Sequence, residues 1–135
     1  MLTYEADVLI PAALENAVTV DNARQIRAEV VVEAANGPTT PDAHDLLVNR
    51  GITVIPDILA NAGGVTVSYF EWVQDRQGYF WSLQEVRQRL DQAMRFAFSD
   101  VMKMSDREKV RPRLAAYMLA VERVASATKL RGVYA

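Results

Sequence analysis

The chain has 135 residues, of which 50% are hydrophobic and 24% charged, and its formal net charge is −2. This length and composition are typical of one globular domain that buries a core without cross-links. The sequence holds no cysteine and a single histidine, His44, which excludes disulfides, thiolate metal sites and histidine-rich zinc sites. There is no basic stripe for nucleic acid, no apolar run long enough to span a bilayer and no signal peptide at the start. We therefore expect a cytoplasmic protein that binds neither nucleic acid nor membranes.

Three short apolar runs recur at similar spacing along the first half of the chain. They cover residues 7–11, 30–34 and 52–56. Each run is nearly continuous in aliphatic and β-branched residues, whereas a strand with one wet face would alternate. Continuous runs are typical of strands that are covered on both faces, as in a parallel sheet. The sequence therefore predicts an α/β fold with three parallel strands.

Two helical segments separate the predicted strands. The first extends from about Asp21 to Arg27, with Asp21 or Asn22 as its N-cap. In the second, Thr40 precedes a proline at the first helical position, and Gly51 stands just past the end. His44 falls on the polar side of this second helix, so we expect a solvated surface side chain there. Right-handed crossovers should connect the strands through both helices.

The C-terminal half has a helical pattern. Residues 82–85 have the spacing of a capping box, and apolar residues follow at steps of three and four from Leu83 to Met104. A break is predicted over 105–112, and a second helix over 114–130 that ends at Gly132. We expect residues 1–72 to form the β/α region and residues 73–135 a helical region, together one compact domain.

The loops that follow the three predicted strands carry the candidate binding residues. They are Ala12 and Ala13, then Asn36 and Gly37, then Asn61, Gly63 and Gly64. Ligands of open parallel sheets bind beyond the carboxyl ends of the strands, where small residues let a flat ring approach the backbone. Each pair alone has a simpler reading, since Asn-Gly often marks a turn and Gly-Gly a helix entrance. Three such loops on one edge favour a ligand site.

A possible second part of this site follows the glycines. Ser68 and Glu71 are spaced as on a helix, although by themselves they are an ordinary surface hydroxyl and a solvated carboxylate. We expect the aromatic residues beside them, Tyr69, Phe70 and Trp72, in a core or an interface and not as a stacking platform.

Three stretches, 32–41, 55–72 and 116–132, resemble the C-terminal part of glutamate dehydrogenase. The resemblance covers almost the whole chain. Dehydrogenases for leucine, phenylalanine and valine share the element 61–64 but lack the continuation 67–72, so the glutamate enzyme is favoured. The resemblance implies a partial Rossmann-like fold: the second half of a doubly wound parallel sheet, followed by long C-terminal helices.

The same resemblance implies a reaction and site roles. The reaction is oxidative deamination of L-glutamate to 2-oxoglutarate and ammonia, with hydride passing to NAD or NADP. By resemblance, the loop of Ala12 and Ala13 lines the cofactor, Asn36 lies by the nicotinamide ribose, and Asn61 lies by the nicotinamide. Ser68 would bind the side-chain carboxylate of the substrate, to which a hydroxyl donates a hydrogen bond. Gly37, Gly63 and Gly64 complete the predicted cofactor-binding set.

Several motifs of that family do not occur in these 135 residues. They are the Gly-Gly-x-Lys-Gly motif of the catalytic lysine, the domain with the catalytic aspartate, the Gly-x-Gly-x-x-Gly turn, and the residue that selects NAD or NADP. We therefore expect no turnover by this chain alone. Three readings stay open: an inactive piece of a dehydrogenase, an enzyme assembled with an N-terminal dehydrogenase polypeptide, or a non-catalytic module for nucleotide binding, regulation or assembly.

The first predicted strand, Val8 to Ile10, raises the question of self-association. In the full six-stranded sheet this strand would be central, but here it should form an apolar edge. We expect copies of the chain to associate through this edge or through swapped helices. A monomer in sedimentation at micromolar concentration would contradict that expectation.

Overall fold

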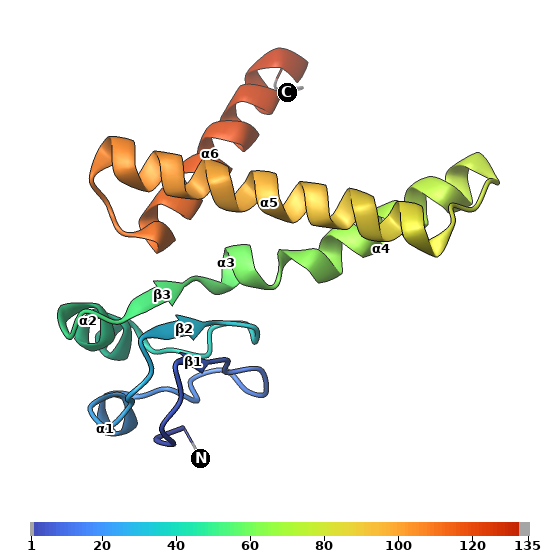
Figure 1. The fold of residues 1–135 in the computed structure, drawn as a ribbon. Helices are drawn as coiled ribbons and strands as arrows, with labels where there is room; N and C mark the ends of the chain where they lie inside the picture. The colour runs from blue at the N-terminus through green and yellow to red at the C-terminus, as the bar shows by residue number, and fades with distance from the viewer. Residues whose placement is uncertain (1, 133–135) are drawn as a thin grey trace.

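The valine-rich runs form a three-stranded parallel sheet with the order β1–β2–β3, shown in a computed structural model that describes residues 2–132 (Figure 1). The strands are β1 (Val8–Leu9), β2 (Val30–Val32) and β3 (Thr53–Ile55). Val31 of the central strand pairs with Leu9 on one side and Val54 on the other. The predicted α/β fold with a parallel sheet is thus confirmed.

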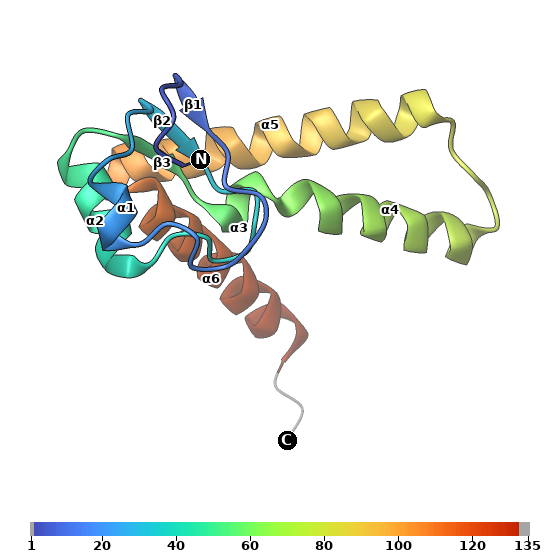
Figure 2. The ribbon, with the colours of Figure 1, turned by 90° about the horizontal axis from the view of Figure 1, so that it is seen from below.

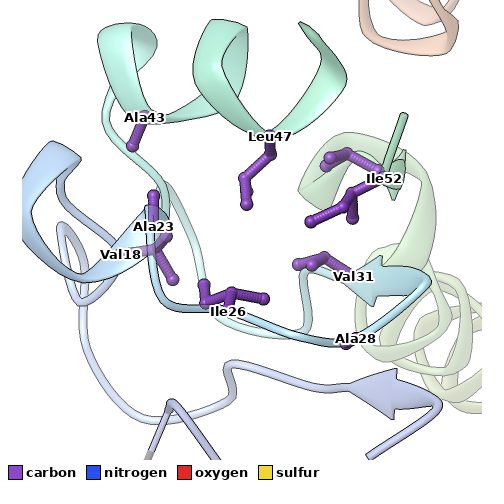
Figure 3. Close-up of a cluster of buried hydrophobic side chains, with 9 residues drawn as sticks. Val18, Ala23, Ile26, Ala28, Val31, Ala43, Leu47 and Ile52 are labelled. Carbon is purple, nitrogen blue, oxygen red and sulfur yellow. The ribbon is translucent and has the colours of Figure 1, made fainter. Parts of the chain in front are cut away.

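One face of the sheet is covered by two helices, α1 (Val20–Ala23) and α2 (Pro41–Asn49). Side chains alternate along a strand, so Val31 and Val54 point to this face and join Ile26 and Leu47 in a buried cluster (Figure 3). Helix α2 begins as predicted, with Thr40 as N-cap and Pro41 at its first position.

The first helix differs from its prediction. It has four residues instead of the seven expected over 21–27, and its N-cap is Thr19, not Asp21 or Asn22. Asn22 instead accepts a hydrogen bond from the backbone N–H of Thr19 at 2.9 Å. The helix ends after Ala23 because the next residues place Ile26, which is fully buried, in the core cluster beneath α2.

The opposite face of the sheet is covered near β3 by α3 (Asp57–Ala60), α5 (Leu83–Glu108) and α6 (Pro112–Arg131). Ile55 points to this side and packs with Leu59 and with Met104 of α5. Small residues at the start of α6, Ala115 and Ala116, let that helix approach closely. The sheet is therefore covered on both sides at β3, as its continuous apolar run predicts.

Helix α4 (Ala62–Gln77) turns back into α5, and the two helices lie side by side as an arm that projects from the sheet (Figures 1 and 2). Gly78 ends α4 in a left-handed conformation, with φ +64°. The predicted capping box opens α5: the Ser82 backbone N–H donates to the Glu85 carboxylate at 2.7 Å, and the Glu85 backbone N–H donates to the Ser82 hydroxyl at 3.3 Å.

The long C-terminal helices are present, with boundaries that differ slightly from those predicted. Helix α5 continues to Glu108, so the break is confined to 109–111. Helix α6 buries Ala115 and Ala116, while Leu114 and Val121 are 51% and 66% exposed. None of the helices in the described range 2–132 is long and apolar enough to cross a membrane.

Strand β1 is the edge of the sheet, as predicted. Val8 is 48% exposed and the neighbouring Ile10 is 58% exposed. Among residues 2–132, only β2 pairs with this strand, so the other side of its backbone is open. An open apolar strand edge can pair with another chain.

Candidate functional site

A groove of about 630 Å³ lies at the carboxyl ends of the strands, where the ligands of open parallel sheets bind. The loop after β1, the loop after β2 and the start of α4 all contribute to its walls. The groove therefore brings together Ala12, Ala13, Asn36 and Asn61. The third predicted loop is largely helical instead, since α3 ends at Ala60 and α4 begins at Ala62, with Asn61 between them. Its full lining is Ala12, Ala13, Leu14, Glu15, Ala34, Ala35, Asn36, Asn61 and Val65.

Two asparagines face each other in this groove. The Asn61 side-chain amide donates to the Asn36 side-chain oxygen at 2.6 Å. This bond uses a donor of Asn61 and the acceptor of Asn36. The side-chain NH₂ group of Asn36 and the side-chain oxygen of Asn61 take no part in this bond. Together they offer a donor and an acceptor, which are complementary to the oxygen and the NH₂ group of a carboxamide ligand.

The other predicted residues lie around the groove without lining it. The Gly37 backbone N–H bonds to Asp57, and Gly37 has φ +52°, a left-handed conformation that favours glycine. Gly63 and Gly64 fall in the first turn of α4, and a Cβ on Gly63 would meet α5 at 3.7 Å. Ser68 is exposed, one helical turn beyond Val65 on the same side of α4. Ligand contact by these four residues stays a prediction.

A buried ionic cluster lies behind the groove. Glu33 directly follows β2 and is fully buried, and Arg113 in the first turn of α6 donates to it. The other arm of the Arg113 guanidinium donates to Asp57 at 3.0 Å. Asp57 itself donates its backbone N–H to Glu33 at 3.0 Å. One cation thus joins two carboxylates from two neighbouring strand ends.

Asp57 is held ionised by its surroundings. Burial by itself raises the pKa of this carboxyl, but hydrogen bonds from the Gly37 and Ile58 amides and the charge of Arg113 outweigh it. The pKa of Asp57 therefore lies below its ordinary value of 3.8. Within residues 2–132 no three His, Asp or Glu side chains gather in a way that could hold a metal ion.

Glu33, Asp57 and Arg113 are not among the predicted site residues. One signal was available: Glu33 directly follows three consecutive valines of a buried strand. A carboxylate in such a place needs a cation or several hydrogen-bond donors. Nothing local indicates that the partner is Arg113, which is 80 residues away.

His44 is buried, at 8% exposure, so the prediction of a solvated surface residue is wrong. The reason is tertiary. Helix α6 places Arg113 near this side of α2, while Arg111 binds Asp45 next to His44. Burial and the charge of Arg113 lower the pKa of His44 below 6.5, although Glu33 opposes this. The imidazole is therefore neutral in the folded chain at pH 7.

Acidification is expected to weaken the fold through His44. Because its folded pKa lies below the unfolded value of about 6.5, the unfolded chain binds the proton more readily. The contribution of His44 to the free energy of unfolding is therefore fully present above about pH 6.5, the unfolded pKa. It is lost as the pH falls below that value toward the folded pKa. Urea unfolding at pH 7.5 and 5.5 measures the loss of unfolding free energy. The variant His44→Gln has no imidazole to protonate, so it should lose less than the unmodified chain. An equal loss in both proteins would contradict this assignment.

The aromatic residues of α4 do not form a core. Tyr69 and Trp72 are 59% and 57% exposed and stack on each other with ring centroids 5.9 Å apart. Phe70 is half-buried against Trp81. The expectation of a core position is thus wrong for Tyr69 and Trp72, because no described element packs over that side of the arm. An interface there stays a prediction.

A comparison of the sequence with known proteins identifies its family. Residues 1–132 match the sequence model of the Glutamate/Leucine/Phenylalanine/Valine dehydrogenase family. The chain belongs to this family. The resemblance drawn from residues 32–41, 55–72 and 116–132 is thereby confirmed.

Individual members of the family show how much of their own length this chain matches. It is 59% identical over 134 residues to a glutamate dehydrogenase of Thermotoga maritima, covering 99% of this chain and 32% of the relative. It is 52% identical over 132 residues to an NAD-specific glutamate dehydrogenase of Staphylococcus aureus, covering 98% and 32%. A structure of hetero-hexameric glutamate dehydrogenase from Thermus thermophilus with leucine bound superposes with a TM-score of 0.95 at 42% identity, covering 99% and 32%. The chain thus spans about a third of the length of these family members.

Proposed function

We propose that this chain forms one side of the cofactor site of an NAD- or NADP-dependent glutamate dehydrogenase. The observation that carries the proposal is the Asn36–Asn61 amide pair in a groove of small residues at the strand ends. The family supports it, since the relatives of highest identity quoted above are glutamate dehydrogenases.

The residues of the groove fit a dinucleotide. Alanines at positions 12, 13, 34 and 35 let a flat ring and a ribose approach the backbone. The Asn36 NH₂ group and the Asn61 carbonyl oxygen match the acceptor and the donor of a carboxamide. When bound, the nicotinamide ring accepts the hydride of the reaction.

The substrate side of the proposal rests on Ser68. This hydroxyl lies one turn beyond the groove-lining Val65, on the same side of α4. A hydroxyl there can donate to the side-chain carboxylate of glutamate. The lysine and aspartate that carry the chemistry in this family come from a region outside these 135 residues.

We further propose that this region is required for turnover and that copies of the present chain self-associate. The open β1 edge and the exposed residues Leu114 and Val121 on α6 support self-association. The hetero-hexameric relative gives independent support. A sedimentation equilibrium at micromolar concentration should show species larger than a monomer.

Transplantation into a complete relative tests the proposal. In a chimaera, this chain replaces the matching segment of the Thermotoga maritima enzyme, to which it is 59% identical. We expect glutamate-dependent reduction of NAD or NADP by the chimaera and by the chain mixed with the remaining segment of the relative. The chain alone should show no turnover.

Two variants sharpen the test. Asn61→Ala should raise the KM for the dinucleotide, and Ser68→Ala should raise the KM for glutamate. Ser126→Ala, on the exposed surface of α6, is the matched control and should change neither constant. A folded chimaera without activity would contradict the proposed function, and binding of NADH without turnover would favour a non-catalytic nucleotide-binding module instead.

A further inference from the structure

A single side chain connects the C-terminal helix to both loops that carry the groove asparagines. Arg113 lies in the first turn of α6 and is 24% exposed. One arm of its guanidinium donates to Asp57 Oδ1 at 3.0 Å, and the other donates to Glu33 Oε2. Arg113 does not line the groove itself.

The two carboxylates also accept hydrogen bonds from backbone amides. The second oxygen of Asp57 accepts the Gly37 N–H at 2.8 Å, and Glu33 Oε2 accepts the Asp57 N–H at 3.0 Å. The Ile58 N–H donates to Asp57 Oδ1 at 2.9 Å. The amides held by these bonds are at Gly37, directly after Asn36, and at the start of the short helix α3, whose C-cap is Asn61.

The geometry of the asparagine pair depends on these amides. Asn36 and Asn61 are 25 residues apart, and their side chains meet at 2.6 Å. Gly37 has φ +52°, one of several conformations open to glycine, and its N–H bond to Asp57 favours this one. A displacement of either loop by about 1 Å would take the pair beyond hydrogen-bond distance.

We propose that Arg113 is a positioning residue for the cofactor groove, acting through Asp57 to hold Asn36 against Asn61. The proposal rests on the function proposed above, and it adds a residue of α6, outside the groove, to the determinants of dinucleotide affinity. The two-armed geometry makes arginine necessary: lysine has the same charge but cannot bridge both carboxylates with a rigid planar fork.

The test uses Arg113→Lys and Asp57→Asn, which keep the size of the side chains close to the original. Arg123→Lys is the matched control, since Arg123 also lies in α6 and also pairs with an aspartate, Asp100, but on the surface. In the chain itself, NMR measures the hydrogen exchange of the Gly37 amide and, as a reference for global opening, of the Val31 amide in the central strand.

We expect exchange at Gly37 to become about tenfold faster relative to Val31 in both variants, because a hydrogen bond to a charged group is lost or weakened. A merely stabilising role would accelerate exchange at Val31 at least as much as at Gly37, so the ratio would not rise. In the active chimaera, both variants should raise the KM for the dinucleotide about tenfold and leave the KM for glutamate unchanged. The control should change neither quantity.

The outcomes separate this inference from the proposed function. An unchanged ratio of Gly37 to Val31 exchange would overturn the positioning role, even if the chimaera is active. A changed ratio with an unaltered KM for the dinucleotide would show that the connection exists without serving the cofactor and would also overturn the proposal. An inactive chimaera would contradict the proposed function, while the exchange ratio would still decide whether Arg113 positions the loop.

Discussion

Replacing Arg113 with methionine is expected to lower the free energy of unfolding by about 3–5 kcal/mol, the cost of leaving a buried charge unpaired. Glu33 is fully buried, and its other oxygen, Oε1, has no hydrogen-bond partner among the described residues. Without Arg113, the negative charge of Glu33 would be offset by a single hydrogen bond, the one from the Asp57 backbone N–H. Urea unfolding followed by circular dichroism at pH 7 measures the change.

A second substitution should recover much of this loss. Glu33→Gln removes the negative charge but keeps an oxygen that accepts the Asp57 N–H. The double variant Glu33→Gln/Arg113→Met is therefore expected to be more stable than Arg113→Met alone, a strongly non-additive result. Arg123→Met, which breaks a surface pair with Asp100, should cost only about 0–1 kcal/mol. If the two substitutions at positions 33 and 113 simply added, the buried-charge explanation would be wrong.

The second large effect is expected in the core beneath α2. Leu47 is fully buried and points toward Val31 and Ile26 (Figure 3). Leu47→Ala removes buried methyl groups and leaves a cavity, so it should lower the free energy of unfolding by about 2–5 kcal/mol. Leu130→Ala makes the same chemical change at a helical position that is 89% exposed.

The control should change stability by no more than about 0.5 kcal/mol. The same urea titration measures both variants. Similar losses for Leu47 and Leu130 would mean that the exposed end of α6 is covered, for example in an oligomer. A small loss for Leu47 would mean that the site collapses around the cavity and that the α/β layer is less rigid than its burial indicates.

The local signals in the sequence predicted the elements well. Continuous apolar runs indicated a parallel sheet, and the three strands pair in parallel as predicted. Cover on both faces is found at β3, whereas β1 is partly exposed. The capping box at Ser82 predicted the start of α5, because both of its hydrogen bonds form within one turn. Thr40 and Pro41 likewise predicted the start of α2, although the Thr40 side chain makes no cap hydrogen bond. Where a signal was weaker, as for α1, tertiary packing shortened the helix.

The candidate site was predicted in part for the same reason. Parallel strands end at one edge, so residues that directly follow them meet there, and Ala12, Ala13, Asn36 and Asn61 do line one groove. The hydrogen bond between the two asparagines was not predictable. It depends on a φ of +52° at Gly37 and on a carboxylate at Asp57 that holds the turn.

The sequence by itself determined the strands, both ends of α2, the start of α5, the edge at which the strands end together and the family. The tertiary structure decided which charges are buried and what they hold. Arg113 reaches Glu33 from 80 residues away, and His44 is buried although its own helix presents it as a polar residue. Helix caps and apolar periodicity act over a few residues, so the sequence shows them directly. Burial and ion pairing depend on which distant segment packs against a site, and here the packing of α6 against β3 and α3 decides them.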